Sequence, residues 1–234
     1  MITGLPTAAA RVPAWLPGEA EIGRRLAAHQ RLYRYRKPRY QIQLLRDLAA
    51  LMPSGDCRIL DIGAGSGLIG EAISELFPGK SVVGVDVAQR LLPTIRFPCS
   101  IYDGRNLPFA DGSFDCALFC NVLHHVDAAA RARLMHEALR VTAGGPLIVK
   151  DHVARSLLDR LRLGALDLAG NLPFGGMVGA QYLAESEWSS LLARLGCTGR
   201  ALQVSAYRSG LSALCFPNRL EICFSMEHSR SSAA

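Results

Sequence analysis

The sequence predicts an α/β fold in which a mainly parallel sheet carries helices on both faces. Apolar runs typical of buried strands alternate with helical segments over residues 57–151. The first of these runs ends in glycines that open a helix, as in a strand–turn–helix unit. A chain of 234 residues with 50% hydrophobic content can also bury a large core in one domain.

The elements follow in order from these patterns. Residues 1–18 contain Pro6, Pro13 and Pro17, and we expect them to be irregular. Helical patterns with Pro38 between them precede the first strand, and Gly144-Gly145 ends the clearest later helix. The expected helices are 19–35, 39–51, 68–77, 128–140 and 185–195, and the expected parallel strands are 57–62, 81–86, 100–102, 114–120 and 147–151.

The most informative stretch is 58–67, which reads R-I-L-D-I-G-A-G-S-G. Glycines at 63, 65 and 67 allow a tight turn whose backbone amides approach a ligand closely, because glycine has no Cβ. The next apolar run ends in Asp86, 19 residues after Gly67. An acidic residue at this place can accept hydrogen bonds from both hydroxyls of a ribose. The pattern indicates a site for a nucleoside cofactor.

The glycine spacing argues against a dinucleotide. The G-x-G-x-x-G fingerprint would require glycine at position 68, which is Leu68. In addition, Asp61 precedes the first glycine, where a carboxylate would repel a pyrophosphate but would suit a cationic ligand.

Asp61, Gly63, Gly65 and Gly67 resemble the [DE]-x-G-x-G-x-G motif of class I S-adenosylmethionine-dependent methyltransferases, specifically the type 11 group that acts on small molecules. The resemblance implies a Rossmann-like sheet closed by an antiparallel pair, here 201–205 and 221–225. It implies S-adenosyl-L-methionine as cofactor, with Gly63 and Gly65 under its methionine portion and Asp61 near its amino end.

Three later motifs are similar to the same family. Asp103-Gly104 precedes L-P-F, D-G-S-F-D (111–115) opens the fourth strand, and N-V-L-H-H-V (121–126) follows it. The resemblance places Asp103 at the adenine amino group and the 121–126 segment at the sulfonium end. The expected cofactor-binding residues are Asp61, Gly63, Ala64, Gly65, Gly67, Asp86, Val87, Asp103, Gly104 and Asn121.

Charge divides the chain at about residue 52. Residues 1–52 hold nine Lys/Arg and three Asp/Glu, whereas the remaining residues hold 17 of each. One interpretation is a solvated helix face. The others are capture of an anionic or aromatic acceptor, weak contact with an acidic membrane surface, and RNA binding. The segment also resembles the N-terminal helices that cover the acceptor pocket in this family, which would bring Tyr33, Tyr35 or Tyr40 to the acceptor. We therefore divide the chain into an acceptor cap, 1–52, and a methyltransferase domain, 53–234.

A long insertion at about 152–195 is expected to carry acceptor specificity. Its Gly-rich stretch 170–179 suits a lid that closes over the pocket, with a plain connection between helices as the alternative.

Methyl transfer to an acceptor that starts protonated needs a general base as well as alignment. His152, after the fifth parallel strand, is the first candidate, and His125 is the second. Adjacent residues are not expected to face one pocket, so one of His124 and His125 should be structural. A metal site from Asp151, His152, Asp167 and Asn171 has no support from ligand spacing, and no metal is predicted.

The acceptor class follows mostly by exclusion. The chain lacks the N-P-P-Y or D-P-P-Y run that stacks a flipped base after the fourth strand, so a small organic acceptor methylated on oxygen, nitrogen or carbon is preferred to nucleic acid. The alternatives are a cofactor-binding partner protein without activity and an RNA methyltransferase. Seven scattered cysteines, no secretory signal and no apolar stretch of about 18 residues favour the cytoplasm. The oligomeric state is not predicted.

Overall fold

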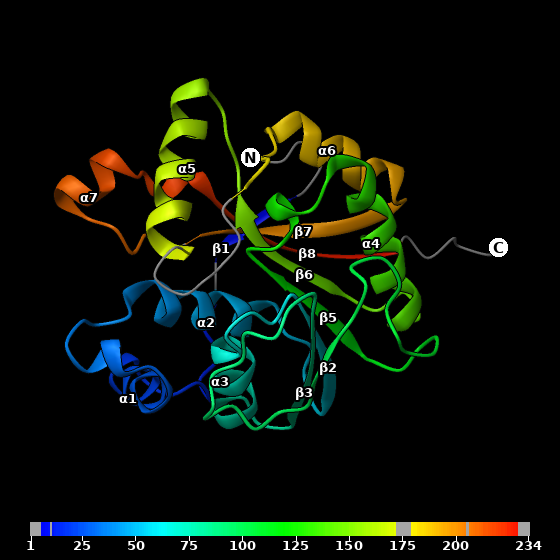
Figure 1. Cartoon of the computed structure of the whole chain (residues 1–234), viewed down its shortest axis with the longest axis horizontal. Coiled ribbons are helices and arrows are strands. Elements are labelled where there is room, and N and C mark those ends of the chain that lie inside the picture. The colour runs from blue at the N-terminus through cyan, green and yellow to red at the C-terminus, as the bar shows by residue number, and fades with distance from the viewer. Residues whose placement is uncertain (1–5, 10, 172–178, 205, 229–234) are drawn as a thin grey trace.

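A computed structural model describes residues 6–9, 11–171, 179–204 and 206–228. Its centre is an eight-stranded sheet in the order β1-β7-β8-β6-β5-β2-β3-β4 (Figure 1). Neighbouring strands are parallel except that β8 is antiparallel to both β6 and β7. The predicted fold class, including the antiparallel pair, is confirmed. The strands are β1 (Thr7–Ala9), β2 (Cys57–Ile62), β3 (Lys80–Asp86), β4 (Cys99–Ile101), β5 (Cys116–Cys120), β6 (Leu147–His152), β7 (Cys197–Gln203) and β8 (Glu221–His228).

Helices cover both faces of this sheet. In Figure 1 the blue and cyan helices α1, α2 and α3 lie on one side, and α4 and α6 lie on the other. Short 3-10 turns η1 (Arg31–Arg34), η2 (Leu123–His125) and η4 (Asn218–Leu220) interrupt the connections. The α-helices are α1 (Glu19–His29), α2 (Arg39–Leu51), α3 (Leu68–Leu76), α4 (Ala128–Val141), α5 (Leu157–Asn171), α6 (Glu185–Arg194) and α7 (Gly210–Cys215).

The central strands are apolar on both faces because each face meets helices. In β2, Leu60 and Ile62 enter the core cluster shared with α4 and α6, whereas Ile59 enters the cluster shared with α1, α2 and α3. In β5, Phe119 and Leu118 divide in the same way. Side chains alternate between the two faces along each strand, so Lys150 of β6 lies on the face that α2 covers.

The N-terminal segment differs from its prediction in two places. Residues 7–9 form β1 and pair with β7, and Leu16 is buried, so 1–18 is not wholly irregular as predicted. The exposed edge of β7 supplies backbone partners that local sequence does not reveal. The helix predicted over 19–35 ends at His29, because Gln30 is extended and its side chain accepts from the Leu32 N–H to start η1.

The helices of 1–52 belong to the same hydrophobic core as the sheet. Ile22 and Leu26 of α1, and Leu45 and Leu48 of α2, are fully buried in the cluster that includes Ile59. Deleting this segment would therefore expose core residues of the sheet.

The insertion contains a helix, α5, that the sequence pattern did not predict. Its Leu157, Leu158, Leu161 and Leu168 are exposed, and Leu163 is buried. Most of the Gly-rich stretch predicted as a lid, 172–178, lies outside the described residues.

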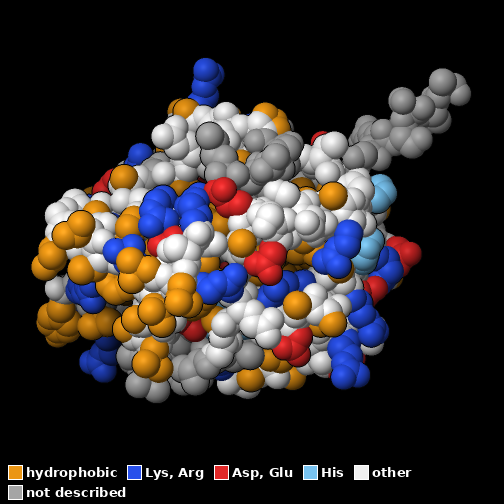
Figure 2. Space-filling view, turned by 90° about the horizontal axis from the view of Figure 1, so that it is seen from above, with side chains coloured by type: hydrophobic (Ala, Val, Ile, Leu, Met, Phe, Trp, Pro, Cys, Tyr) orange, Lys and Arg blue, Asp and Glu red, His pale blue; other side chains and the backbone are white. Residues whose placement is uncertain are grey.

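Hydrophobic side chains gather at one end of the surface, on the left of Figure 2, where α7 lies in Figure 1. Leu211 and Leu214 of α7 are exposed. No helix in the described part of the chain is long and apolar enough to cross a membrane.

Candidate active site

The glycine turn, residues 63–67, connects β2 to α3 at the carboxyl edge of the sheet. Gly63, Gly65 and Gly67 all have φ in the left-handed region, at 77°, 55° and 76°. A Cβ on Gly63 would lie 2.6 Å from Val122 Cγ2, so this glycine lets the 121–126 segment pack against the turn. A Cβ on Gly65 would meet only the Gly63 carbonyl, at 3.9 Å. The space beside Gly65 is therefore open to a ligand.

Asp86 ends β3 directly opposite this turn. Its Oδ2 accepts from the backbone N–H of Gly65 at 2.7 Å, and its Oδ1 accepts from Ala88 N at 3.1 Å and from the Arg90 guanidinium at 3.1 Å. A carboxylate has about four acceptor positions. A ribose hydroxyl could therefore take the remaining position, and a second could replace Arg90.

Asp61 lies next to Asp86 and is almost completely buried. Burial, and then the charge of Asp86, raise the pKa of the Asp61 carboxyl to about 7. Two buried carboxylates side by side favour a cation, because a positive charge would stabilise both.

The residues expected at the adenine lie on the loop after β4. Asp103 is exposed and accepts from the backbone N–H groups of Arg105 and Asn106, both at 2.8 Å, so its carboxylate caps its own turn. Gly104 has φ 73°, and a Cβ there would lie 3.2 Å from Val87 Cγ1. Val87 and Gly104 thus lie side by side at the rim of the site.

Asn121 directly follows β5 and has φ 57°, which is uncommon for a residue with a side chain. Its Nδ2 donates to the Tyr40 hydroxyl at 2.6 Å. Its Oδ1 is buried and has no hydrogen-bond partner among the described residues. A buried acceptor without a partner is costly, so Asn121 is suited to receive a donor from a ligand.

Beyond Asn121 lies a buried polar network formed by Tyr40, Lys150, Tyr207, Arg208 and Glu221. The Lys150 ammonium contacts the Glu221 carboxylate and donates to the Tyr40 hydroxyl at 3.2 Å. Glu221 also accepts from Tyr207 Oη at 2.8 Å and from Arg208 at 2.6 Å. Burial alone would raise the pKa of Glu221, but these cations hold it well below its ordinary value.

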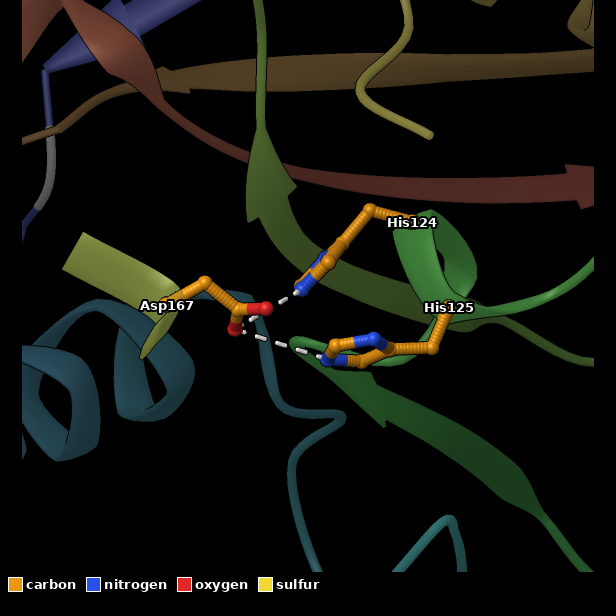
Figure 3. A group of neighbouring side chains, drawn as sticks. All are labelled: His124, His125 and Asp167. Carbon is orange, nitrogen blue, oxygen red and sulfur yellow. Dashed lines mark ion pairs between the residues drawn. The ribbon is translucent and has the colours of Figure 1, made fainter. Parts of the chain in front are cut away.

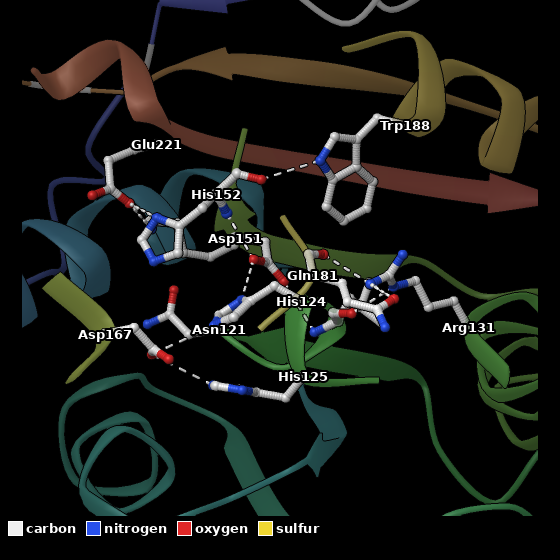
Figure 4. A network of polar contacts seen from close by, with 12 residues as sticks. Asn121, His124, His125, Arg131, Asp151, His152, Asp167, Gln181, Trp188 and Glu221 are labelled. Carbon is white, nitrogen blue, oxygen red and sulfur yellow. Dashed lines mark hydrogen bonds and ion pairs between the residues drawn. The ribbon is translucent and has the colours of Figure 1, made fainter. Parts of the chain in front are cut away.

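His152 lies between Glu221 of this network and the ring of His124 (Figure 4). Its Nδ1 lies 3.2 Å from Glu221 Oε2, and its carbonyl accepts from Trp188 Nε1 at 3.2 Å. The ring is 5.2 Å from that of His124, centroid to centroid. His152 is thus held at the carboxyl end of β6 beside a charged carboxylate.

His124 and His125 lie in η2, and both rings face Asp167 of α5 (Figure 3). Their centroids are 4.1 Å apart. The expectation that adjacent residues cannot face one pocket was wrong, because a 3-10 turn does not alternate its side chains as a strand does.

The two rings differ in charge. Burial alone would lower the pKa of His124, but Asp151, whose Oδ1 lies 2.5 Å from its Nδ1, together with Asp167 raises it to about 9. Burial, and then the charge of His124, lower the pKa of His125. At neutral pH, His125 is therefore the ring able to accept a proton.

The structure brings the expected cofactor residues Asp61, Gly65, Asp86 and Asn121 to one edge and leaves Asp103 at its exposed rim. Sequence reasoning missed Lys150, Tyr207, Arg208 and Glu221. A lysine inside the apolar run 147–151 was the one available signal. A separate surface cavity, lined by Asp115, Arg140 and His228 among others, lies at the opposite edge and contains none of the expected site residues.

Residues 60–149 match the family model described as "Methyltransferase domain". The matched range begins within β2 and ends within β6, and so contains every expected cofactor residue. This part of the chain is a class I methyltransferase domain of the type 11 group. The predicted family is confirmed.

Curated relatives of the methyltransferase domain are matched over part of their length. The "Ubiquinone biosynthesis O-methyltransferase" of Cereibacter sphaeroides is 35% identical over 113 residues, which are 44% of each chain. The "Demethylmenaquinone methyltransferase" of Renibacterium salmoninarum is 33% identical over 143 residues, 55% of this chain and 58% of that one. The chain thus spans about half the length of these relatives.

Solved structures support the fold. A SAM-dependent methyltransferase from Methanosarcina mazei aligns with a TM-score of 0.54 and 21% identity, covering 77% of this chain and 96% of that one. A SAM-dependent methyltransferase from Thermotoga maritima aligns with a TM-score of 0.56 and 18% identity, covering 89% and 99%. At such identities the likeness concerns the fold alone.

Proposed function

We propose that this protein transfers a methyl group from S-adenosyl-L-methionine to a small organic acceptor. The observation that carries the proposal is the convergence of the open glycine turn, Asp86 and the unpartnered amide oxygen of Asn121 at one sheet edge, within a methyltransferase domain. The names of the two aligned solved structures, both SAM-dependent methyltransferases, agree with this cofactor.

The residues present fit the cofactor. Asp61 would provide negative charge for the cationic end of the cofactor, and Asp86 would provide acceptors for its ribose. The space beside Gly65 would admit its methionine portion. When bound, the cofactor supplies an electrophilic methyl group on a sulfonium. This chain's residues then have to orient an acceptor, exclude water and remove a proton.

The acceptor side is bounded by aromatic rings as well as charges. Tyr182 stacks on His124 with 5.3 Å between ring centroids, and its ring is 6.1 Å from that of His152. Tyr40 reaches the same region from the N-terminal segment, which supports a role for 1–52 at the acceptor. We therefore propose a hydroxylated aromatic ring as acceptor, in keeping with the quinone-related names of the two curated relatives.

His152 is the general base that we propose, with Glu221 beside its Nδ1 to hold the ring and stabilise its protonated form. His125, with Nδ1 2.9 Å from the Gly179 carbonyl, is the second candidate.

The function is tested by incubating the protein with cofactor labelled in its methyl group and a panel of phenols, quinols, amines and carbon acids, followed by mass spectrometry. We expect a labelled phenol or quinol and S-adenosylhomocysteine in equal amounts. Cofactor binding without S-adenosylhomocysteine production by any acceptor or cell extract would favour the non-catalytic alternative.

On the acceptor so identified, His152→Gln should lower kcat by about 10²- to 10⁴-fold, the usual contribution of a general base. The affinity for S-adenosylhomocysteine should stay within about twofold, because His152 is not among the cofactor residues. His136→Gln, an exposed change on α4, is the matched control. Unchanged kcat in His152→Gln would transfer the role to His125.

A further inference from the structure

His124, His125 and Asp167 place three ligand atoms around one point (Figure 3). The Nε2 atoms of His124 and His125 lie 3.8 and 3.6 Å from Asp167 Oδ1, and one ligand atom from each residue lies within 4.8 Å of the others. Ligand atoms bound about 2.1 Å from a tetrahedral ion lie roughly 3.4 Å apart. The two His–Asp distances exceed that spacing by only a few tenths of an ångström.

The other nitrogen of each ring is already engaged. His124 Nδ1 lies 2.5 Å from the Asp151 carboxylate, and His125 Nδ1 lies 2.9 Å from the Gly179 carbonyl (Figure 4 draws the first contact). The Asp151 carboxylate and the Gly179 carbonyl can only accept a hydrogen bond, so the Nδ1 atom of each ring is protonated and donates. On His125, which is neutral, the lone pair is then on Nε2, and on His124 a bound ion would displace the second proton from Nε2; both Nε2 atoms point to Asp167. Metal-binding histidines are oriented in this way, by a carboxylate or a backbone carbonyl behind the ring.

A proton shared between the groups is the competing explanation. An imidazolium that bridged Asp151 and Asp167 by hydrogen bonds would approach both carboxylates to about 2.7–2.9 Å. His124 Nε2 instead remains 3.8 Å from Asp167. It is buried, with a side chain only 1% exposed, and makes no hydrogen bond within the described part of the chain. The spacing leaves room for an ion between the groups.

We propose that His124 Nε2, His125 Nε2 and the Asp167 carboxylate bind a divalent transition-metal ion, with zinc as the reference ion. Two imidazoles favour such an ion over magnesium or calcium, which prefer oxygen ligands. Three protein ligands leave a fourth position for water or an acceptor oxygen, as in catalytic zinc sites. The proposal does not depend on methyl transfer, and it makes His125 a ligand and not the general base.

The site is accessible and differs from the other candidate group in the described residues. The side chains of His125 and Asp167 are 12% and 13% exposed, which gives an ion a way in. The second group consists of His29, Glu71 and Glu75. There, one Glu71 oxygen already accepts the backbone N–H groups of Arg96 and Phe97, and no acceptor behind His29 orients its ring.

The test uses the full chain without an affinity tag, freed of metal by chelation and then titrated with Co²⁺ and with Zn²⁺. We expect one Zn²⁺ per chain by calorimetry and a visible Co²⁺ absorbance that Zn²⁺ displaces. His125→Ala and, separately, Asp167→Ala should weaken Zn²⁺ binding by at least about tenfold, since loss of an outer partner alone costs 10- to 100-fold.

The matched controls are His136→Ala and Asp111→Ala, both exposed, and His29→Ala for the second group. All three should bind Zn²⁺ as the parent does. Circular dichroism, and the rise in melting temperature on adding S-adenosylhomocysteine, identify the variants that remain folded. Both measurements are made without metal. Zn²⁺ affinity unchanged in folded His125→Ala and Asp167→Ala, or lost in His29→Ala, would overturn the site. Equal affinity for Mg²⁺ would overturn the choice of ion.

Discussion

The two halves of the carboxyl edge are built in different ways. At the cofactor half, backbone groups of the glycine turn are held by one side chain, Asp86, from the neighbouring strand. At the acceptor half, side chains from distant parts of the chain are buried against one another: Asn121 contacts Tyr40 across 81 positions, and Lys150 contacts Tyr40 across 110. The first half binds a ligand common to many enzymes. The second half buries a lysine, an arginine and a glutamate together, which carries an electrostatic cost.

This difference should be clearest in the free energy of unfolding. Glu221→Ala would remove the carboxylate that pairs with the buried Lys150 ammonium and leave the Tyr40 hydroxyl 3.2 Å from it. Removing one member of a buried ion pair costs about 3–5 kcal/mol. We expect a loss of this size in urea unfolding without ligand. Tyr40→Phe, which removes one hydroxyl from the same network, is the control and should cost about 1 kcal/mol.

If Glu221→Ala costs no more than Tyr40→Phe, the polar network does not stabilise the acceptor half, and the contrast between the halves is lost. If both variants have the same urea midpoint of unfolding as the parent, the charges of Lys150 and Glu221 are better solvated than their burial indicates.

The same difference decides what could be read from the sequence. The glycine turn and Asp86 belong to consecutive strands, so local spacing was enough to predict them and the sheet around them. Tyr40 and Glu221 meet only because α2 and the start of β8 reach the same edge. No local pattern records that juxtaposition. The prediction that His124 and His125 point apart was wrong for a related reason. Their orientation depends on η2 and on Asp167 of α5, and no local pattern shows that these two elements meet.

At the cofactor half, Asp86→Ala should weaken S-adenosylhomocysteine binding by about 2 kcal/mol or more, because charge-assisted hydrogen bonds to the ribose would be lost. The variant also frees the Gly65 N–H, so part of the loss reflects a looser turn. Calorimetry gives the affinity, and urea unfolding gives the accompanying change in stability.

Arg90→Ala is the matched control, because it removes a partner of Asp86 without touching the carboxylate. Its affinity for S-adenosylhomocysteine should equal or exceed that of the parent. Unchanged affinity in Asp86→Ala would remove Asp86 from the site and leave the glycine turn as the sole binding element of that half.

The smallest expected effect concerns protons at Asp61. Its pKa of about 7 in the free protein lies above the ordinary value of 3.8, so between about pH 4 and 7 the folded state binds more protons than the unfolded state. Asp61 therefore stabilises the fold least above pH 7, where its carboxylate is charged beside Asp86. A bound cation should relieve this repulsion and pull the pKa of Asp61 down.

If the cation lowers that pKa well below 6, binding releases a proton at pH 6, and affinity for S-adenosylmethionine rises about tenfold between pH 6 and pH 8. Calorimetry in two buffers with different ionisation enthalpies counts the protons released. Asp61→Asn keeps the shape of the side chain and should remove this pH dependence, leaving only that of the ligand's own amino group. If the parent and Asp61→Asn release the same number of protons on binding, Asp61 does not respond to the cation of the cofactor. The cofactor half would then depend on Asp86 for its charge, and the buried Asp61 would serve the packing of α3 against β2.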